Sequence, residues 1–236
     1  MITIDFNKLD ISPDARILDI GCGEGRHTIK ACQQKDTICI GADFAFKNLV
    51  ETKNKLAFHK NFNDLKCKTI DLSCMDVTKL PFKSNSFDSI ICSEVLEHIL
   101  DDAMAISELI RILKPKKILA VSVPRFWPEK ICWLLSDEYF NANMGHVRIY
   151  KKKSLIKTIE SFGVKHYACH YAHSIHAPFW WLKCFFGPNR TDSKPVNLYH
   201  RLLVWDLMKK PKLTYTIDKL LNPVLGKSLI LYFKKL

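Results

Sequence analysis

Short apolar runs alternate with longer stretches of helical periodicity from Ala15 to Val123. Each run is apolar along most of its length, which is typical of strands buried on both faces of a parallel sheet. We predict strands at Arg16–Ile20, Ile38–Ala42, Lys68–Leu72, Ser89–Cys92 and Ile118–Val123. The predicted helices between them are Gly25–Gln34, Phe46–Phe62 and Leu96–Leu100, the last continuing from Asp101 to Leu113. This alternation predicts an α/β fold with a Rossmann-like, doubly wound and mainly parallel sheet.

The rhythm changes after Pro124. Residues 125–150 show no clear period, and we expect an irregular insert there. A helix at Lys152–Phe162 and strands at Val164–Tyr171 and Ser228–Phe233 would complete a sheet of seven strands. Glycine and proline residues bound three further predicted helices, Pro178–Phe186, Leu198–Lys210 and Leu213–Leu221. We therefore expect a single domain over residues 1–236, with a ligand-binding core at 15–124 and helical insertions at 125–150 and 172–226 that cover the site.

Charge divides the chain at the same point. Residues 1–124 carry 17 Lys/Arg and 17 Asp/Glu, whereas residues 125–236 carry 19 and 7, which is the whole net excess of +12. The second part also holds all five tryptophans. The nine cysteines form no CxxC pair, the N-terminus lacks a secretory pattern, and no apolar run approaches the ~20 residues of a membrane span. We expect a cytoplasmic protein with reduced thiols.

A glycine-rich turn carries the first chemical signal. The predicted strand Arg16–Ile20 ends in Asp19-Ile20, and Gly21-Cys22-Gly23-Glu24-Gly25 then opens a helix. Glycines allow a tight turn and a close approach of the backbone to a ligand. Asp43 follows the next strand about 20 residues on, where a carboxylate can accept hydrogen bonds from ribose hydroxyls. A dinucleotide such as NAD is a rival ligand, although Arg26 stands where that pattern has glycine or alanine.

At these residues the chain resembles the class I S-adenosylmethionine-dependent methyltransferases, in particular the type 11 or UbiE-like group. The resemblance runs from Ala15 to Gly163. It continues through Asp76-Val77, Leu80-Pro81-Phe82, Phe87-Asp88-Ser89-Ile90-Ile91, Glu94-Val95-Leu96-Glu97-His98 and Leu113-Lys114-Pro115. Lys116-Lys117 departs from the glycine pair that the family usually has after the proline.

The resemblance implies a cofactor, S-adenosylmethionine, and the residues that bind it. Asp19 with Gly21, Cys22 and Gly23 would face the methionine part, and Asp43 would hold the ribose. Asp76, flanked by Met75 and Val77, would bond the adenine amino group. Ser93 and Glu94 would border the sulfonium and the acceptor.

Methyl transfer needs a base only when the acceptor must lose a proton. His98 and His146 are the candidates, because imidazole titrates in the right range, and packing roles for both stay open. Tyr150 lies where related methyltransferases often line the acceptor pocket. Glu94, Glu97 and His98 have helical i, i+3, i+4 spacing and could bind a divalent cation with His146, as in certain RNA 2′-O- and ubiquinone-pathway methyltransferases. We favour a capping and packing role and predict no metal.

The apolar, aromatic segment from His176 to Phe186 favours a small or lipid-like hydrophobic acceptor, with Trp127, Trp180 and Trp181 expected to line its pocket. Tryptophans beside basic residues also suit peripheral contact with an anionic membrane. Nucleic acid is the less favoured partner, because the aromatic residues are not interleaved with arginine. An RNA methyltransferase and a cofactor-binding scaffold without activity remain the alternatives.

Overall fold

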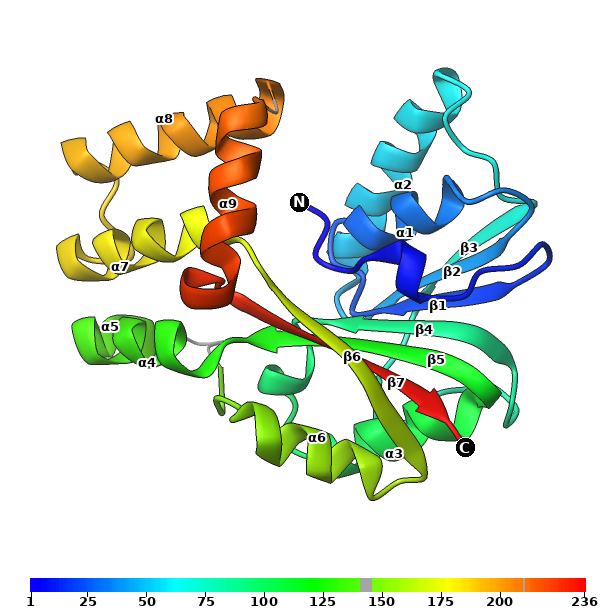
Figure 1. Ribbon diagram of the computed structural model, residues 1–236. Helices are drawn as coiled ribbons and strands as arrows, with labels where there is room; N and C mark the ends of the chain where they lie inside the picture. The colour runs from blue at the N-terminus through cyan, green and yellow to red at the C-terminus, as the bar shows by residue number, and fades with distance from the viewer. Residues whose placement is uncertain (141–145, 210) are drawn as a thin grey trace.

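The computed structural model describes residues 1–140, 146–209 and 211–236, and its centre is a twisted sheet (Figure 1). Within the described residues the sheet has seven strands in the order β3-β2-β1-β4-β5-β7-β6. β7 is antiparallel to both of its neighbours, while the other pairs are parallel. The strands are β1 (Arg16–Ile20), β2 (Ile38–Asp43), β3 (Thr69–Cys74), β4 (Phe87–Ser93), β5 (Leu113–Pro124), β6 (Val164–Ala172) and β7 (Ser228–Lys235). The predicted α/β, doubly wound, mainly parallel fold is confirmed.

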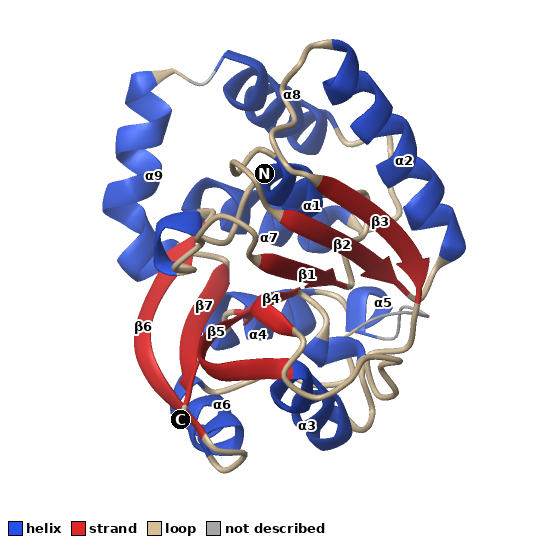
Figure 2. Cartoon of the chain, turned by 90° about the vertical axis from the view of Figure 1, so that its right-hand side faces the viewer, coloured by secondary structure: helices blue, strands red, loops and turns tan. Residues whose placement is uncertain are grey.

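Helices cover both faces of this sheet, as Figures 1 and 2 show. On one face α1 (Arg26–Cys32) and α2 (Phe46–Asn61) bury side chains such as Ile29 and Leu56 against β1 and β2. On the other face α3 (Asp102–Ile112) and α6 (Lys152–Glu160) bury Leu109 and Ile159 against β4, β5 and β7. The two apolar layers explain why the central strands are apolar on both sides.

The predicted continuous helix from Leu96 to Leu113 is wrong in its first part. A short 3₁₀ helix, η2 (Leu96–His98), precedes α3, which begins only after Asp101. The Asp101 side chain accepts a hydrogen bond from the Met104 backbone N–H at 2.9 Å and so caps α3. Asp101 is therefore a helix start rather than a mid-helix residue.

The insert at 125–150 is more regular than we expected. It contains α4 (Phe126–Leu135) and α5 (Asp137–Phe140), while residues 141–145 lie outside the described part. Three more helices separate β6 from β7, preceded by η3 (Ser174–His176): α7 (Ala177–Phe186), α8 (Lys194–Lys209) and α9 (Lys212–Leu225). Position 210, the predicted end of the second of these helices, is also outside the described part. None of the described helices is long and apolar enough to cross a membrane.

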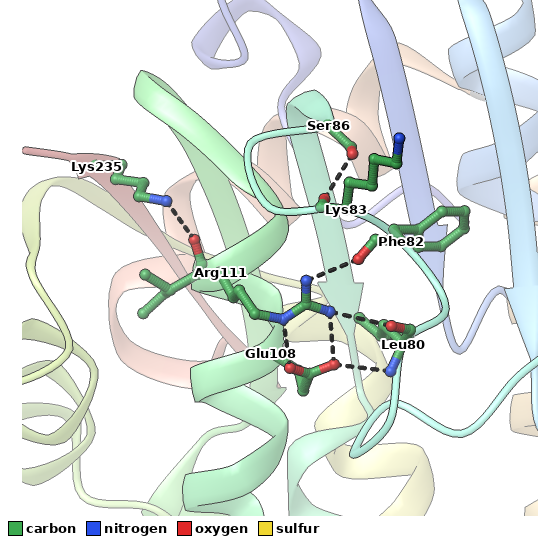
Figure 3. Close-up of polar contacts among 8 residues, drawn as sticks. Leu80, Phe82, Lys83, Ser86, Glu108, Arg111 and Lys235 are labelled. Atoms are coloured by element: carbon green, nitrogen blue, oxygen red, sulfur yellow. Dashed lines mark hydrogen bonds and ion pairs between the residues drawn. The ribbon is translucent and has the colours of Figure 1, made fainter.

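An arginine of α3 holds the loop that follows β3 (Figure 3). The Arg111 guanidinium donates to the Phe82 carbonyl at 2.7 Å and to the Leu80 carbonyl at 3.0 Å. It also donates to both oxygens of Glu108, at 2.6 and 2.9 Å, and Glu108 accepts from the Leu80 backbone N–H at 2.8 Å. Two side chains on one turn of α3 thus fix a loop that has no secondary structure of its own.

We expect Arg111→Ala to lower the free energy of unfolding by about 2–3 kcal/mol, because Glu108 and two carbonyl groups lose a charged donor. Arg111→Lys should restore little, because an ammonium cannot reproduce the planar fork. Urea unfolding measures both effects. Lys83→Ala, on the exposed side of the same loop, is the control and should be near neutral. An equal loss in that control would show that the loop tolerates no substitution at all and that Arg111 has no special role.

Candidate functional site

A cavity of about 1110 Å³ opens where the parallel strands end. Its walls come from the segments after β1, β2, β3 and β4, joined by His146 and Val147 from the insert. In open α/β sheets the carboxyl ends of the strands are where ligands bind. The volume is slightly above the ~300–1,000 Å³ that is typical of small-molecule and cofactor sites, so the cavity is large enough for a ligand of that class.

The glycine turn after β1 forms the floor of the cavity. Gly21 has φ 67°, and a Cβ there would lie 2.2 Å from Cγ2 of Val95. Gly23 has φ 55°, and a Cβ there would meet no atom within 4 Å. Gly21 is therefore required by both packing and conformation, and Gly23 by conformation while leaving open space beside it. Cys22 between them is buried, is not among the lining residues, and donates its backbone N–H to the Ala42 carbonyl.

Asp43 joins the floor to the next wall. Its Oδ2 accepts from the Gly23 backbone N–H at 2.7 Å. Its Oδ1 accepts from the Ala45 backbone N–H at 2.8 Å and from the Asn48 amide at 3.0 Å. The carboxylate is 8% exposed and borders the cavity. It is thus fixed in place and retains acceptor capacity for a ligand, since two ionised oxygens offer about four acceptor positions.

Met75, Asp76 and Val77, which the family resemblance assigned to the adenine, form the wall beside Asp43. The Met75 backbone N–H donates to the Asp43 carbonyl at 3.1 Å, which ties this wall to β2. Oδ1 of Asp76 accepts from the backbone N–H and the hydroxyl of Thr78, both at 2.8 Å. These bonds aim an exposed carboxylate at the cavity and leave its second oxygen for a polar ligand group.

Asp19 and Ser93 lie behind the floor and are not among the lining residues. Asp19 is 1% exposed, and its Oδ2 accepts from the Thr28 hydroxyl at 2.6 Å. Burial raises the pKa of Asp19 to about 6, against the hydrogen bond from Thr28, which lowers it. The Ser93 hydroxyl is 2.8 Å from that of Ser122. Asp19 and Ser93 can therefore affect a ligand in the cavity only indirectly, through the position of the glycine turn or through their own electric field.

Glu94 does line the cavity. It has φ 58°, its backbone N–H donates to the Ser122 carbonyl at 2.9 Å, and its Oε1 accepts from the Ser122 hydroxyl at 2.9 Å. This left-handed residue breaks the helical spacing assumed for Glu94, Glu97 and His98, so the three do not share one helical face. The reason is that the chain turns sharply at the end of β4.

Three of the four residues considered for a cation nevertheless converge. One ligand atom from each of Glu97, His98 and His146 lies within 4.8 Å of the others, and the two imidazole rings are 4.9 Å apart. Glu97 is fully buried, and neither of its oxygens has a hydrogen-bond partner among the described residues. Burial, reinforced by the nearby Glu94, raises the pKa of Glu97 well above its usual value.

Glu129 of α4 is a site residue that sequence reasoning missed. It is 1% exposed and accepts from Nδ1 of His146 at 2.5 Å and from the Tyr139 hydroxyl at 3.1 Å. Burial alone would raise the pKa of Glu129, but the hydrogen bond and charge of His146 outweigh it and leave the pKa below the usual value. The carboxylate therefore orients the imidazole of His146 at the cavity wall. No motif marks Glu129, since it lies in a segment without a period.

Neither Tyr150 nor the three tryptophans expected in the acceptor pocket line the cavity. The Tyr150 hydroxyl donates to the Leu96 carbonyl and to Asp102, at 3.2 and 2.5 Å.

The described residues do not form the expected tryptophan-lined pocket. Trp127 and Trp181 pack against each other between α4 and α7, with ring centroids 5.5 Å apart, and Trp180 lies beside Lys227. Among the described lining residues there is no tryptophan.

Comparison with known proteins agrees with this geometry. Residues 18–121 match a family described as a methyltransferase domain. A ubiquinone biosynthesis O-methyltransferase of Bartonella bacilliformis is 30% identical over 58% of this chain and 54% of its own length. A cycloartenol-C-24-methyltransferase of Arabidopsis thaliana is 26% identical over 60% of this chain and 38% of its own length. The chain thus spans about half of these relatives or less.

Solved structures share the fold over nearly the whole chain. A SAM-dependent methyltransferase from Aquifex aeolicus superposes with a TM-score of 0.57 at 12% identity, covering 98% of this chain and 87% of its own. At that identity the likeness concerns the fold alone. The matched domain contains the glycine turn, Asp43, Asp76 and Glu94, all of which line the cavity. Residues 18–121 of the chain thus match a methyltransferase domain, and the chain shares the fold of SAM-dependent methyltransferases of known structure.

Proposed function

We propose that this protein transfers a methyl group from S-adenosylmethionine to an apolar, lipid-like acceptor. The observation that carries the proposal is the continuity of one cavity, which runs from the polar wall at Asp43 and Asp76 to an apolar wall beside His98 and His146. The apolar wall consists of Val95, Ile99, Leu100 and Val147. The relatives named as ubiquinone and cycloartenol methyltransferases add support for an apolar acceptor.

The residues of the polar half fit the cofactor that the family implies. The space beside Gly23, which a Cβ would enter, admits a ligand close to the backbone. Asp43 would accept hydrogen bonds from ribose hydroxyls, and Asp76 from the adenine amino group. S-adenosylmethionine supplies a methyl group already activated by its positively charged sulfur. The protein then has to hold the acceptor in line and exclude water.

The His146–Glu129 pair supplies a base where the acceptor must lose a proton. Because Nδ1 donates to Glu129, the neutral imidazole presents Nε2 as an acceptor. Nε2 of His146 would take the acceptor proton, and the buried Glu129 carboxylate would stabilise the imidazolium that forms. Glu129 acts here as a positioning residue, because it is not among the residues that line the cavity.

Asp43→Ala should weaken the binding of S-adenosylhomocysteine by roughly ten- to a hundredfold, because hydrogen bonds to a charged acceptor are lost. Isothermal calorimetry measures the affinity, and Asp71→Ala, an exposed carboxylate on β3, is the control. Unchanged affinity in Asp43→Ala would remove this residue from the donor site.

Leu100→Glu should leave S-adenosylhomocysteine affinity within about twofold but abolish transfer to an apolar acceptor, because it places a charge at the cavity mouth. Leu100 is 81% exposed, so the change should not disturb folding. The assay measures transfer of a labelled methyl group to each of three acceptors: a hydroquinone with an isoprenoid tail, a sterol and structured RNA. Leu134→Glu on α4, at 76% exposure, is the matched control.

Label in RNA rather than in the organic phase would replace this proposal with RNA methylation. Tight binding of the cofactor without transfer to any of these acceptors would favour the alternative of an inactive scaffold.

A second candidate, cation-assisted O-methylation, is favoured by one observation. The buried oxygens of Glu97, which have no hydrogen-bond partner among the described residues, lie near two imidazoles. Glu129 bonds Nδ1 of His146, and carboxylates commonly bond one nitrogen of a histidine whose other nitrogen binds a metal. A divalent cation there would bind an acceptor oxygen and lower its pKa. Glu94, the fourth expected ligand, is bonded to Ser122 instead.

We expect EDTA to leave methyl transfer intact. Only three of the four expected ligands converge, and Glu97 can remain buried as a neutral carboxylic acid without a cation. Calorimetry measures Mn²⁺ binding directly and does not depend on activity. The variant His98→Ala removes a candidate ligand, and His59→Ala is its control. Activity lost on chelation and regained with Mg²⁺ or Mn²⁺, together with binding that only His98→Ala removes, would establish the second candidate.

Contact with a membrane surface belongs to the proposed function, because a lipid-like acceptor resides there. The net charge of +12, all of it in residues 125–236, supports attraction to anionic lipid.

A further inference from the structure

Helix α9 turns an apolar stripe to solvent. No residue of α9 is buried along its fully described length. Leu213, Ile217, Leu220 and Val224 are 69%, 38%, 71% and 63% exposed. Their i, i+4, i+7, i+11 spacing places them on one face of the helix. The inward side is held instead by polar contacts, such as that of Asp218 with the Ser174 hydroxyl at 2.8 Å. Helices in a folded domain normally bury their apolar face, so this stripe lacks its partner.

Helix α8 carries a second stripe. Val196 and Leu203 are buried against α7, whereas Leu198, Leu202 and Trp205 on the opposite side are 69%, 48% and 47% exposed. These three also follow i, i+4, i+7 spacing. Both helices lie at the outer end of the molecule, away from α3 and α6 (Figure 1). We define the α8–α9 face by its exposed apolar residues: Leu198, Leu202, Trp205, Leu213, Ile217, Leu220 and Val224.

The charged side chains that α8 and α9 expose to solvent are basic. Every described lysine and arginine of the two helices is exposed: Lys194, Arg201, Lys209, Lys212 and Lys219. The two acidic residues are engaged within the protein. Asp206 accepts from the Thr214 hydroxyl, and Asp218 accepts from Ser174, Ile175 and Asn222. The face is therefore apolar with a basic border.

We propose that the α8–α9 face docks the protein on the surface of an anionic lipid bilayer. An apolar stripe with Lys and Arg beside it is the pattern of helices that lie in the membrane interface. Neither helix can span a bilayer, so the contact is parallel to the surface. The inference rests on the membrane contact of the proposed function and assigns it to a surface.

A second copy of this chain is a poorer occupant. A twofold contact brings the same patch of both subunits together, and here it would set two basic borders against each other. RNA is also poorer, because every residue of the face except Trp205 is leucine, isoleucine or valine, which cannot stack on bases. The aromatic helix α7, where the sequence suggested the membrane contact, is less suited. Its Trp181 packs against α4 and donates to the Pro128 carbonyl at 3.0 Å.

Vesicle co-sedimentation tests the proposal without reference to methyl transfer. The full chain is mixed with vesicles of phosphatidylglycerol and phosphatidylcholine and, separately, of phosphatidylcholine alone. We expect binding to the anionic vesicles that weakens as salt rises. Leu198→Glu and Leu220→Glu should each lower the partition coefficient about tenfold or more, whereas Leu236→Glu, at 77% exposure on a different part of the surface, should not. Lys219→Ala should lower it about fivefold, and Lys153→Ala on α6 should not.

Unchanged affinity for S-adenosylhomocysteine and an unchanged circular dichroism spectrum show that each variant is folded, since the cavity contains none of these residues. Vesicle binding that survives either α8–α9 leucine variant overturns the proposal. So does a solution dimer, seen by analytical ultracentrifugation, that Leu220→Glu dissociates, or salt-sensitive binding of RNA in place of vesicles. None of these results would affect the assignment of the donor site, which calorimetry on Asp43→Ala decides.

Discussion

One residue, Asp43, joins the three segments that make the polar half of the cavity. The side chain of Asp43 accepts from the glycine turn after β1 and from the turn that begins α2, while its carbonyl accepts from Met75 after β3. Without the carboxylate, the turn after β1 and the turn that begins α2 would lose their common anchor, and only the backbone bond from Met75 would remain. In the proposed function the same carboxylate would also accept hydrogen bonds from the ligand, so this position would combine ligand binding with support of the surrounding backbone. Arg111 does the corresponding work at the far end of the β3 loop, from the opposite layer of helices.

The sheet and the glycine turn could be predicted because their signals are local. The strand Phe87–Ser93 is buried at every position, and its apolar centre, Ile90-Ile91-Cys92, falls within the predicted strand Ser89–Cys92. Gly21 and Gly23 have positive φ, a conformation that glycine adopts without strain. Asp43 is singled out by its place at the end of a strand, whereas Asp76 is expected only from the resemblance to the family. The strand and turn signals depend on neighbours in the sequence, which is why the expected α/β architecture was confirmed.

The other half of the cavity depends on contacts between distant segments. Glu129 meets His146 only because the segment that follows His146 is bonded to η2, where the Val147 N–H donates to the Glu97 carbonyl, and nothing around Glu129 in the sequence marks it. The helical spacing of Glu94, Glu97 and His98 misled for a related reason. The chain leaves β4 through a left-handed residue, so periodicity computed across that point has no physical meaning. The tryptophans of α4 and α7 likewise serve packing between helices, and their apolar character alone could not distinguish that from a binding pocket.

The placement of β7 between β5 and β6 has a consequence for folding. β7 pairs with β5 residue by residue although the partners, such as Ile118 and Lys234, are more than a hundred positions apart. β5 and β6 do not pair with each other, so each keeps an open edge until this one strand arrives. The β1–β2–β3 half is assembled from local parallel units and can order earlier, because closing short loops is less costly. The β1–β2–β3 half should thus be structured while two strand edges are still free to pair with other chains, and that interval is when the protein is most exposed to aggregation.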